Sequence, residues 1–201
     1  MVLAIDIGNS NIVIGCFDKE KILFEEWLST VQNATALEYT LRINTILELN
    51  ELESGDISGA IISSVVPSVT QTVKQAISRL TGKEALIVGP GIKTGLKIRL
   101  DNPAQLGSDH AANAVGAIRD YPMPAIIIDM GTATTVSVID RQENYRGGMI
   151  YPGMIVSLAS MTDQASQLPN ISLDAPKKII GTNTIDCMKS GIIYSTITVK
   201  R

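Results

Sequence analysis

The chain has 201 residues, of which 45% are hydrophobic and 18% charged, and its formal net charge at pH 7 is −3. This composition is typical of a folded protein with one large domain or two lobes, and it excludes extensive disorder. No run of Lys or Arg is longer than the pair Lys177 and Lys178, which argues against nucleic-acid binding because that requires a clustered basic surface.

No segment resembles a membrane span or a secretion signal. The first apolar run has no basic leader and is interrupted by Asp6, and no other segment approaches the roughly 18 apolar residues of a membrane helix. Cys16 and Cys187 form no metal-binding or disulfide pattern, so we expect two reduced, mostly buried thiols. We therefore expect a cytoplasmic protein with no membrane partner.

The first half of the chain predicts three strands followed by alternating helices and strands. Apolar, β-branched runs between turn residues indicate the strands, and apolar residues at helical spacing indicate the helices. The predicted strands lie at 2–6, 11–17, 21–28, 60–67 and 85–88, and the predicted helices at 35–50 and 68–80.

A segment rich in Gly, Pro and Lys at 89–103 separates this half from a predicted helix at 108–120. We therefore place an N-terminal lobe at 1–105 and a C-terminal lobe at 106–201. The C-terminal lobe continues with strand, turn and strand over 125–140 and with a third strand over NYRGGMIYP.

The strand-turn-strand unit of the C-terminal lobe repeats the start of the chain. Each copy has an apolar strand, an acidic residue, a Gly-containing turn and a second β-branched strand. The alignment sets Asp6 against Asp129, Gly8 against Gly131 and Val13 against Val136, an offset of 123 residues (129 − 6). The repeat predicts two lobes related by internal duplication.

The first turn, DIGNSN, has the chemistry of a phosphate-binding hairpin. Gly8 can adopt a positive φ and bring backbone N–H groups close to an anion, and Asn9, Ser10 and Asn11 add neutral donors. Asp6 can orient hydrated Mg²⁺. One such turn alone is better explained as an ordinary hairpin, but two facing copies would contact phosphates from both sides of a cleft.

The segment NPAQLGSDHAANAVGAI places Ser108 and Asp109 at the start of an Ala-rich helix. Either residue can be a helix cap, and Asp109 can equally be a general base that accepts a proton from a substrate hydroxyl. His110 is the only histidine, which excludes a His-rich metal site. A glycine-rich turn precedes a helix near Gly153, and GTNT at 181–184 starts another, where Thr184 can cap the helix or contact a ligand.

The ordered motifs resemble those of the type III pantothenate kinases, which belong to the actin-like superfamily of acetate and sugar kinases. They are DIGNSN at 6–11, NPAQLGSDH at 102–110, DMGTATT at 129–135, GGMIYPG at 147–153 and GTNT at 181–184. The resemblance implies an α/β fold of two RNase H-like lobes and ATP-dependent phosphorylation of pantothenate, the first step towards coenzyme A.

The resemblance also assigns the site residues. It implies that Asp6, Ile7, Gly8, Asn9, Ser10, Asn11, Ile12 and Val13 form the ATP phosphate loop, that Thr132 adds a nucleotide contact and that Asp129 holds K⁺ or NH₄⁺. Gly107, Ser108, Asp109, His110 and Thr184 would line the pantothenate site, with Asp109 as the proton acceptor. A homodimer with its active site near the subunit interface is implied.

The chain departs from the family pattern at three places. His110 stands where the family has Arg, and it is a weaker, non-forked partner for a carboxylate or phosphate. Leu100 stands where an aromatic residue is common. By analogy with the first lobe, the second needs two more strands than this sequence supplies, so we expect a truncated or frameshifted product.

These departures leave two alternatives to a pantothenate kinase. The first is a non-catalytic binding or regulatory homologue, which the departures at His110 and Leu100 and the expected truncation of the second lobe favour. The second is a superfamily kinase for another hydroxyl or carboxyl acceptor, because the phosphate loops do not select the acceptor. A panel of acceptor alcohols and acids separates the two kinases.

Overall fold

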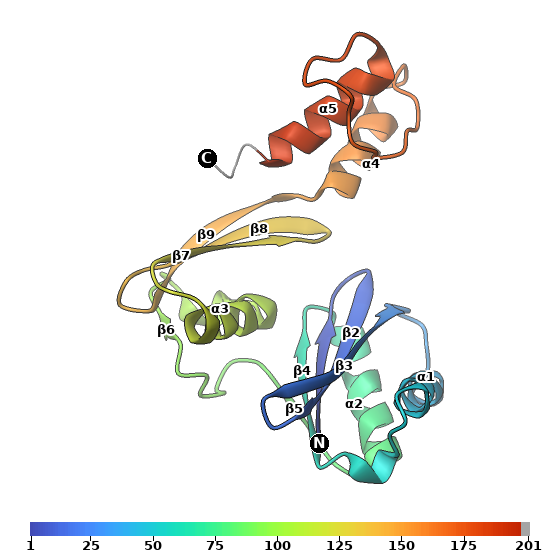
Figure 1. Cartoon of the computed structure of the whole chain (residues 1–201), viewed down its shortest axis with the longest axis vertical. Coiled ribbons are helices and arrows are strands. Elements are labelled where there is room, and N and C mark those ends of the chain that lie inside the picture. Colours follow the sequence, from blue (N-terminus) through green and yellow to red (C-terminus); the bar gives the residue numbers. More distant parts are fainter. Residues whose placement is uncertain (198–201) are drawn as a thin grey trace.

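The computed structural model describes residues 1–197 and contains two β-sheets and five α-helices within that range (Figure 1). The strands are β1 (Val2–Ile7), β2 (Asn11–Asp18), β3 (Lys21–Ser29), β4 (Gly59–Ser64), β5 (Ala85–Ile87), β6 (Lys97–Ile98), β7 (Ala125–Met130), β8 (Ala133–Ile139) and β9 (Asn144–Pro152). The helices are α1 (Ala36–Leu49), α2 (Pro67–Thr81), α3 (Ser108–Asp120), α4 (Met154–Gln164) and α5 (Thr184–Ile197), with short 3₁₀ turns at Ser54–Asp56 and Pro103–Gln105. The mixed α/β class is confirmed.

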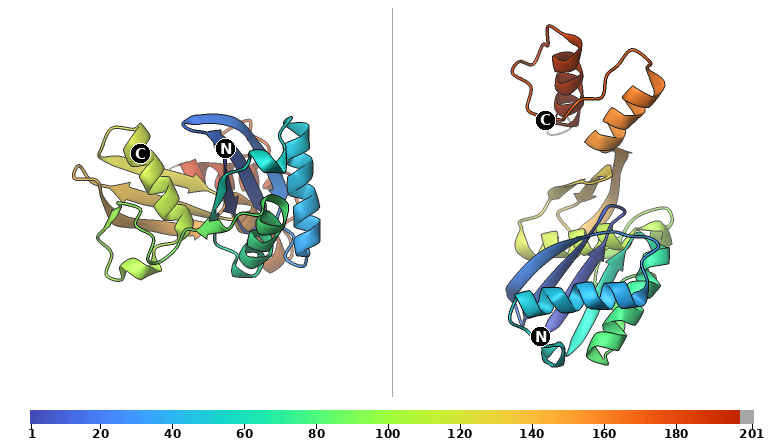
Figure 2. Two further views of the ribbon diagram at one scale, coloured as in Figure 1. Left: turned by 90° about the horizontal axis from the view of Figure 1, so that it is seen from below. Right: turned by 90° about the vertical axis from the view of Figure 1, so that its right-hand side faces the viewer.

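The first sheet has the strand order β3-β2-β1-β4-β5, with β1 antiparallel to β2 and parallel to β4. Alternate residues of each strand point to opposite faces. The apolar residues of one face are buried under α1 and α2, which lie on the same side of the sheet (Figure 2). They include Leu3, Ile5, Ile7, Ile12, Ile14 and Cys16. The alternation leaves Asp6 and Val13 on the other face, opposite each other in register.

Both helices of this lobe begin where local chemistry favours a helix start. Thr35 and Glu38 form a capping box at α1, and the hydrogen bonds that Thr35 donates to Glu38 lower the pKa of that carboxyl. Pro67 occupies the first turn of α2, so it opens this helix and does not end the preceding strand as the sequence suggested. Gly82 ends α2 in the left-handed region with φ 68°.

The second sheet has the order β6-β9-β8-β7. Strands β7, β8 and β9 repeat the β1-β2-β3 meander, but β7 pairs only with β8 in the described part of the chain, whereas its counterpart β1 also pairs with β4. The buried core beside the second sheet is correspondingly small and consists of Ala114, Ile139 and Tyr145 with partly buried neighbours.

The register refines the proposed internal repeat. Asp6 lies opposite Val13, and Asp129 lies opposite Thr135. The structural counterpart of Val13 is therefore Thr135, and the alignment with Val136 was wrong by one position because the second turn is one residue shorter. The two acidic residues nevertheless occupy equivalent places at the ends of β1 and β7.

The two-residue strand β6 was not predicted from the sequence. It pairs with β9, so Lys97 and Ile98 belong to the second sheet although a boundary at 105/106 assigns them to the first lobe. The boundary itself stays a prediction, and positions 198–201 of the predicted second lobe lie outside the described residues. Cys16 is buried as expected, but Cys187 is exposed because α5 packs mainly against α4.

Helix α3 lies on the side of the first sheet opposite α1 and α2, and it contacts β4 as well as β7 and β8 (Figure 1). It therefore touches both sheets. Helices α4 and α5 pack against each other beyond the end of β9, away from α1 and α2 (Figure 2). None of the helices within residues 1–197 is long and apolar enough to cross a membrane.

Candidate active site

The first hairpin turn, Gly8–Ser10, leaves two of its amide groups, those of Asn9 and Ser10, without a backbone partner among residues 1–197. Thr30 donates two hydrogen bonds to carbonyl groups of the turn. Its Oγ1 donates to Gly8 O at 2.7 Å and its N–H donates to Ser10 O at 2.9 Å. The N–H groups of Asn9 and Ser10 make no backbone hydrogen bond within the described chain. These two amides are therefore available to an anion.

Gly8 is required for space and not for a positive φ, which corrects the sequence interpretation. Its N–H donates to Asn11 O at 2.9 Å, and a Cβ at this position would lie 3.1 Å from the same oxygen. The turn is therefore closed by a direct backbone approach that a larger residue would disturb.

The second hairpin turn, Gly131 and Thr132, is closed in the same way and touches the first. Gly131 N–H donates to Ala133 O at 3.1 Å. The hydroxyls of Ser10 and Thr132 lie 3.2 Å apart, so the two repeats face each other as the sequence predicted. The glycines of the GGMIYPG segment have a more local role, because a Cβ on Gly153 would collide with the backbone of this turn.

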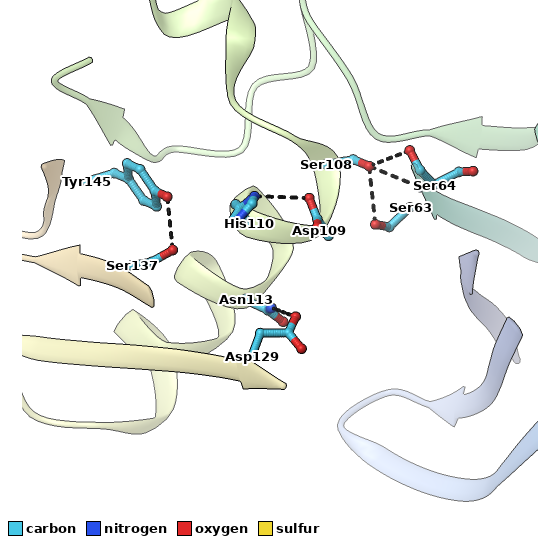
Figure 3. A network of polar contacts seen from close by, with 9 residues as sticks. All are labelled: Ser63, Ser64, Ser108, Asp109, His110, Asn113, Asp129, Ser137 and Tyr145. Carbon is cyan, nitrogen blue, oxygen red and sulfur yellow. Dashed lines mark hydrogen bonds and ion pairs between the residues drawn. The ribbon is translucent and has the colours of Figure 1, made fainter. Parts of the chain in front are cut away.

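The N-terminus of α3 is fastened to the end of β4. Ser108 Oγ donates to Ser64 O at 2.9 Å and accepts from Ser64 N–H at 3.0 Å (Figure 3). Gly107 is the N-cap residue, so neither Ser108 nor Asp109 caps the helix. A Cβ on Gly107 would collide with Asp109 Oδ1, so a larger residue here would force the Asp109 carboxylate to move.

Asp109 lines the cleft between the first sheet and α3, and one of its carboxylate oxygens, Oδ1, is buried beside His110. His110 Nδ1 lies 3.2 Å from Oδ1, a contact that is an ion pair when the imidazole is protonated (Figure 3). Oδ1 accepts no hydrogen bond from the other residues in 1–197. The Asp109 carboxylate is a hydrogen-bond acceptor for a ligand hydroxyl in the cleft.

Asp6, Asp109 and Asp129 line one cleft of about 320 Å³ between the first sheet and α3. Its remaining lining is mostly apolar and includes Val13, Phe17, Ile61 and Val88. Partial burial raises the pKa of Asp6, and the nearby charges of Asp109 and Asp129 raise it further, while a hydrogen bond with Ser63 opposes the rise. The Asp6 carboxyl is therefore close enough to Asp109 and Asp129 to be repelled by both.

A cation would relieve this repulsion. No group of three Asp, Glu, His or Cys side chains in residues 1–197 has the spacing of a direct metal site. Mg²⁺ commonly uses only one or two carboxylates and completes its shell with water and phosphate oxygens, so Asp6 and Asp129 fit a cation bound jointly with a nucleotide.

Two contributors to the cleft were missed from the sequence. Asn113, one turn after Asp109, donates from Nδ2 to Asp129 Oδ2 at 3.0 Å. Ser63 at the end of β4 donates to Ser108 Oγ at 3.4 Å, and its hydroxyl opposes the rise in the pKa of Asp6. The spacing of Asn113 from Asp109 on a predicted helix was the available signal, since residues four apart share a face.

Thr184 is not brought to this cleft within one chain. It begins α5, which packs against α4 away from α3 (Figure 1). Asn183 caps that helix, because its Oδ1 accepts from Asp186 N–H at 2.9 Å. The predicted residues Asp6–Val13, Gly107–His110, Asp129 and Thr132 do gather around the two turns and the start of α3.

Comparison with known proteins identifies the family. The sequence profile of the type III pantothenate kinases matches residues 2–199. The chain belongs to the type III pantothenate kinase family. The pantothenate kinase of Halalkalibacterium halodurans is 41% identical over 198 residues, which is 98% of this chain and 78% of that protein. The Bacillus cytotoxicus enzyme is 39% identical over 197 residues, 98% of this chain and 75% of its own.

Solved structures support the fold assigned to this family member. A conserved Campylobacter jejuni protein described as a Baf family transcriptional activator matches with a TM-score of 0.56 at 20% identity, over 98% of this chain and 77% of its own. The activator of 2-hydroxyisocaproyl-CoA dehydratase from Clostridium difficile, with bound ADPNP, matches with a TM-score of 0.51 at 14% identity, over 100% of this chain and 66% of its own. At these identities the likeness concerns the fold alone.

Proposed function

We propose that this chain transfers the γ-phosphoryl group of ATP to the primary hydroxyl of pantothenate. The observation that carries the proposal is the position of Asp109, which lines the cleft that also contains Asp6 and Asp129 beside the two facing turns. Membership of the type III pantothenate kinase family selects the acceptor.

The proposed roles follow from what each group can do chemically. The free amides of Asn9 and Ser10 bind phosphate oxygens, and Thr132 adds a donor from the second turn. Asp109 accepts the proton of the acceptor hydroxyl as the phosphoryl group is transferred. Gly107 and His110 border the acceptor site beside it.

Two cations complete the proposed site. Mg²⁺ with ATP and a monovalent cation would neutralise the charge on the transferring group, and phosphoryl transfer depends chiefly on such positioning and neutralisation. Asp6 orients the first through its water shell, and Asp129 holds the second, K⁺ or NH₄⁺. The excess of carboxylates in the cleft supports both assignments.

The proposed assembly is a homodimer in the cytoplasm. Helices α4 and α5 and the loop between them expose large apolar side chains, among them Ile155, Ile179 and Ile180, which a second copy would cover. Light scattering on the purified protein at several concentrations tests the dimer, and a monomer at all of them contradicts it.

The function is tested by incubating the protein with ATP, Mg²⁺, K⁺ and labelled pantothenate and identifying the product by mass spectrometry. We expect a monophosphate in which the primary hydroxyl is modified. Asp109→Asn should lower kcat by about 10²- to 10⁴-fold, the range for loss of a general base. Full turnover by this variant excludes Asp109 as the base.

A binding homologue is the second candidate, because His110 lies beside the proposed base where the family has Arg. It predicts calorimetric binding of ATP or pantothenate with no phosphorylated product. Enzyme-like turnover by the pure wild-type protein rejects this alternative.

A further inference from the structure

Helix α3 is held at its first residue by the first sheet. Ser108 makes two hydrogen bonds to the backbone of Ser64, at 2.9 and 3.0 Å, and Ser63 Oγ lies 3.4 Å from the same hydroxyl. The donor and acceptor capacity of the Ser108 hydroxyl is therefore directed to the end of β4. This arrangement leaves Ser108 poorly placed to bind a substrate, which is the role that the sequence suggested.

The same helix is held by the second sheet one turn later. Asn113 Nδ2 donates to Asp129 Oδ2 at 3.0 Å, a hydrogen bond to a carboxylate at the end of β7 (Figure 3). Such charge-assisted bonds are stronger than neutral ones. The bond restricts rotation of the Asp129 side chain, which is otherwise exposed to solvent.

Asp109 lies between these two anchors. Asp109 and Asn113 are four residues apart, so they lie on one face of α3, and both line the cleft. Figure 3 shows Ser108 directed to β4 and Asn113 directed to Asp129, with Asp109 on the intervening turn. Movement of either sheet relative to α3 would have to break the hydrogen bonds of Ser108 to Ser64 or that of Asn113 to Asp129.

We propose that Ser108 and Asn113 are positioning residues that set Asp109 between the two phosphate-binding turns, and that Asn113 acts by orienting the Asp129 carboxylate. This inference rests on the proposed function. It assigns roles to two residues that contact no reacting atom, and it replaces substrate binding as the role of Ser108.

The Asn113 contribution is tested with a double-mutant cycle of Asn113→Ala and Asp129→Ala, read as the affinity for a non-hydrolysable ATP analogue with Mg²⁺, with and without added K⁺. We expect Asn113→Ala to weaken binding in K⁺ by about tenfold, as for loss of one hydrogen bond to a charged group. It should have no further effect when Asp129 is already replaced. Equal losses in both backgrounds overturn the proposal.

Two further variants separate positioning from folding. Asn113→Asp preserves the side-chain volume but replaces the donor with a second carboxylate, so it should match or exceed the effect of Asn113→Ala. Asn44→Ala removes a comparable amide-to-carboxylate bond on α1, from Asn44 Nδ2 to Glu48 Oε1 at 2.6 Å, and should bind the analogue as the wild type does. A normal affinity for the Asn113→Asp protein contradicts the assigned bond.

Ser108 is tested by turnover. Ser108→Ala should lower kcat about tenfold with the KM for pantothenate nearly unchanged, because the base is displaced while acceptor contacts remain. Ser108→Thr retains the hydroxyl and should recover most of the rate. A raised KM with normal kcat would instead make Ser108 a substrate contact. Because nucleotide affinity is measured without turnover, an inactive wild type refutes the proposed function and leaves the Asn113 cycle readable.

Discussion

Ser10 Oγ lies 3.2 Å from Thr132 Oγ1, so the turns of the two repeated hairpins touch although 122 residues separate them in the chain. Each turn also presents its residues at the end of a strand that carries an acidic residue, Asp6 in β1 and Asp129 in β7. The proposed phosphate-binding surface is therefore built by residues from both sheets.

Replacement of Thr132 by Ala should weaken nucleotide binding without affecting the acceptor. Loss of one neutral hydrogen bond corresponds to about 3- to 10-fold in affinity, so we expect the KM for ATP to rise by that factor at a nearly constant KM for pantothenate. Thr72→Ala on α2 is the control and should behave as wild type, because it removes an exposed hydroxyl whose one hydrogen bond within residues 1–197 goes to Ser68 O. An unchanged KM for ATP would remove Thr132 from the nucleotide site.

Replacement by Ala should impair turnover at Gly107, before α3, but increase stability at Gly116, within α3. In Gly107→Ala the new Cβ collides with Asp109 Oδ1, so the carboxylate of the proposed base must rotate and kcat should fall by at least about tenfold. At Gly116, within the same helix, a Cβ meets nothing within 4 Å. Gly116→Ala should therefore raise the free energy of unfolding by about 0.5–1 kcal/mol with normal turnover.

Steady-state kinetics and urea unfolding of both proteins measure these effects. A fully active Gly107→Ala enzyme would mean that the position of Asp109 is not critical for the reaction. Destabilisation by Gly116→Ala would contradict the open space beside that helix position.

The repeated turns could be predicted from the sequence because each is specified locally. An apolar strand, an acidic residue and a Gly turn appear twice, and strand alternation then fixes which face carries Asp6 and Asp129. The pairing of the turns followed from the assumption that duplicated lobes face each other, and the contact between Ser10 and Thr132 confirms it.

Features that depend on tertiary contacts could not be predicted from the sequence. Strand β6 has only two residues and exists because β9 offers an edge to Lys97 and Ile98. Asn113 looks like an ordinary helix residue until β7 brings Asp129 to it. Thr184 and Cys187 depend on how α5 packs, and neither the GTNT motif nor composition determines that packing.

Removal of the Asp6 charge should stabilise the protein while inactivating it. Burial raises the pKa of Asp6 above its ordinary value of 3.8, so the folded state binds more protons than the unfolded state as pH rises through that value. Stability is therefore lost between pH 3.8 and the raised pKa, and the penalty persists at higher pH. Asp6→Asn should increase the free energy of unfolding at pH 7 and make little difference below pH 3.8.

Thermal unfolding of wild type and Asp6→Asn across this pH range provides the measurement, with nucleotide affinity recorded in parallel. Asp18→Asn is a matched control that should leave nucleotide affinity unchanged, because Asp18 lies at the end of β2 remote from the Gly8–Ser10 turn. An Asp6→Asn protein that is less stable than wild type at pH 7 would mean that favourable contacts of the carboxylate exceed the cost of its burial.

The charge of the cleft predicts which acceptors are used. Asp6, Asp109, Asp129 and Glu25 line it, and no Lys or Arg of the described residues does. An acceptor that reacts through a carboxylate must bring a fifth negative charge among these groups, whereas one that reacts through a hydroxyl presents a neutral donor to Asp109. Pantothenate meets this condition because its carboxylate lies at the end of the molecule remote from its primary hydroxyl.

We therefore expect the kcat/KM for acetate to be lower than that for pantothenate by about 100-fold or more, since a site built for a hydroxyl donor rejects analogues that cannot satisfy it. The alcohol analogue of pantothenate, which keeps the reacting end but has no carboxylate, should be phosphorylated by the same enzyme. A sugar kinase would prefer glucose or a related hexose in the same panel. Preference for acetate would refute the acidic cleft as the basis of acceptor selection and favour a carboxyl kinase.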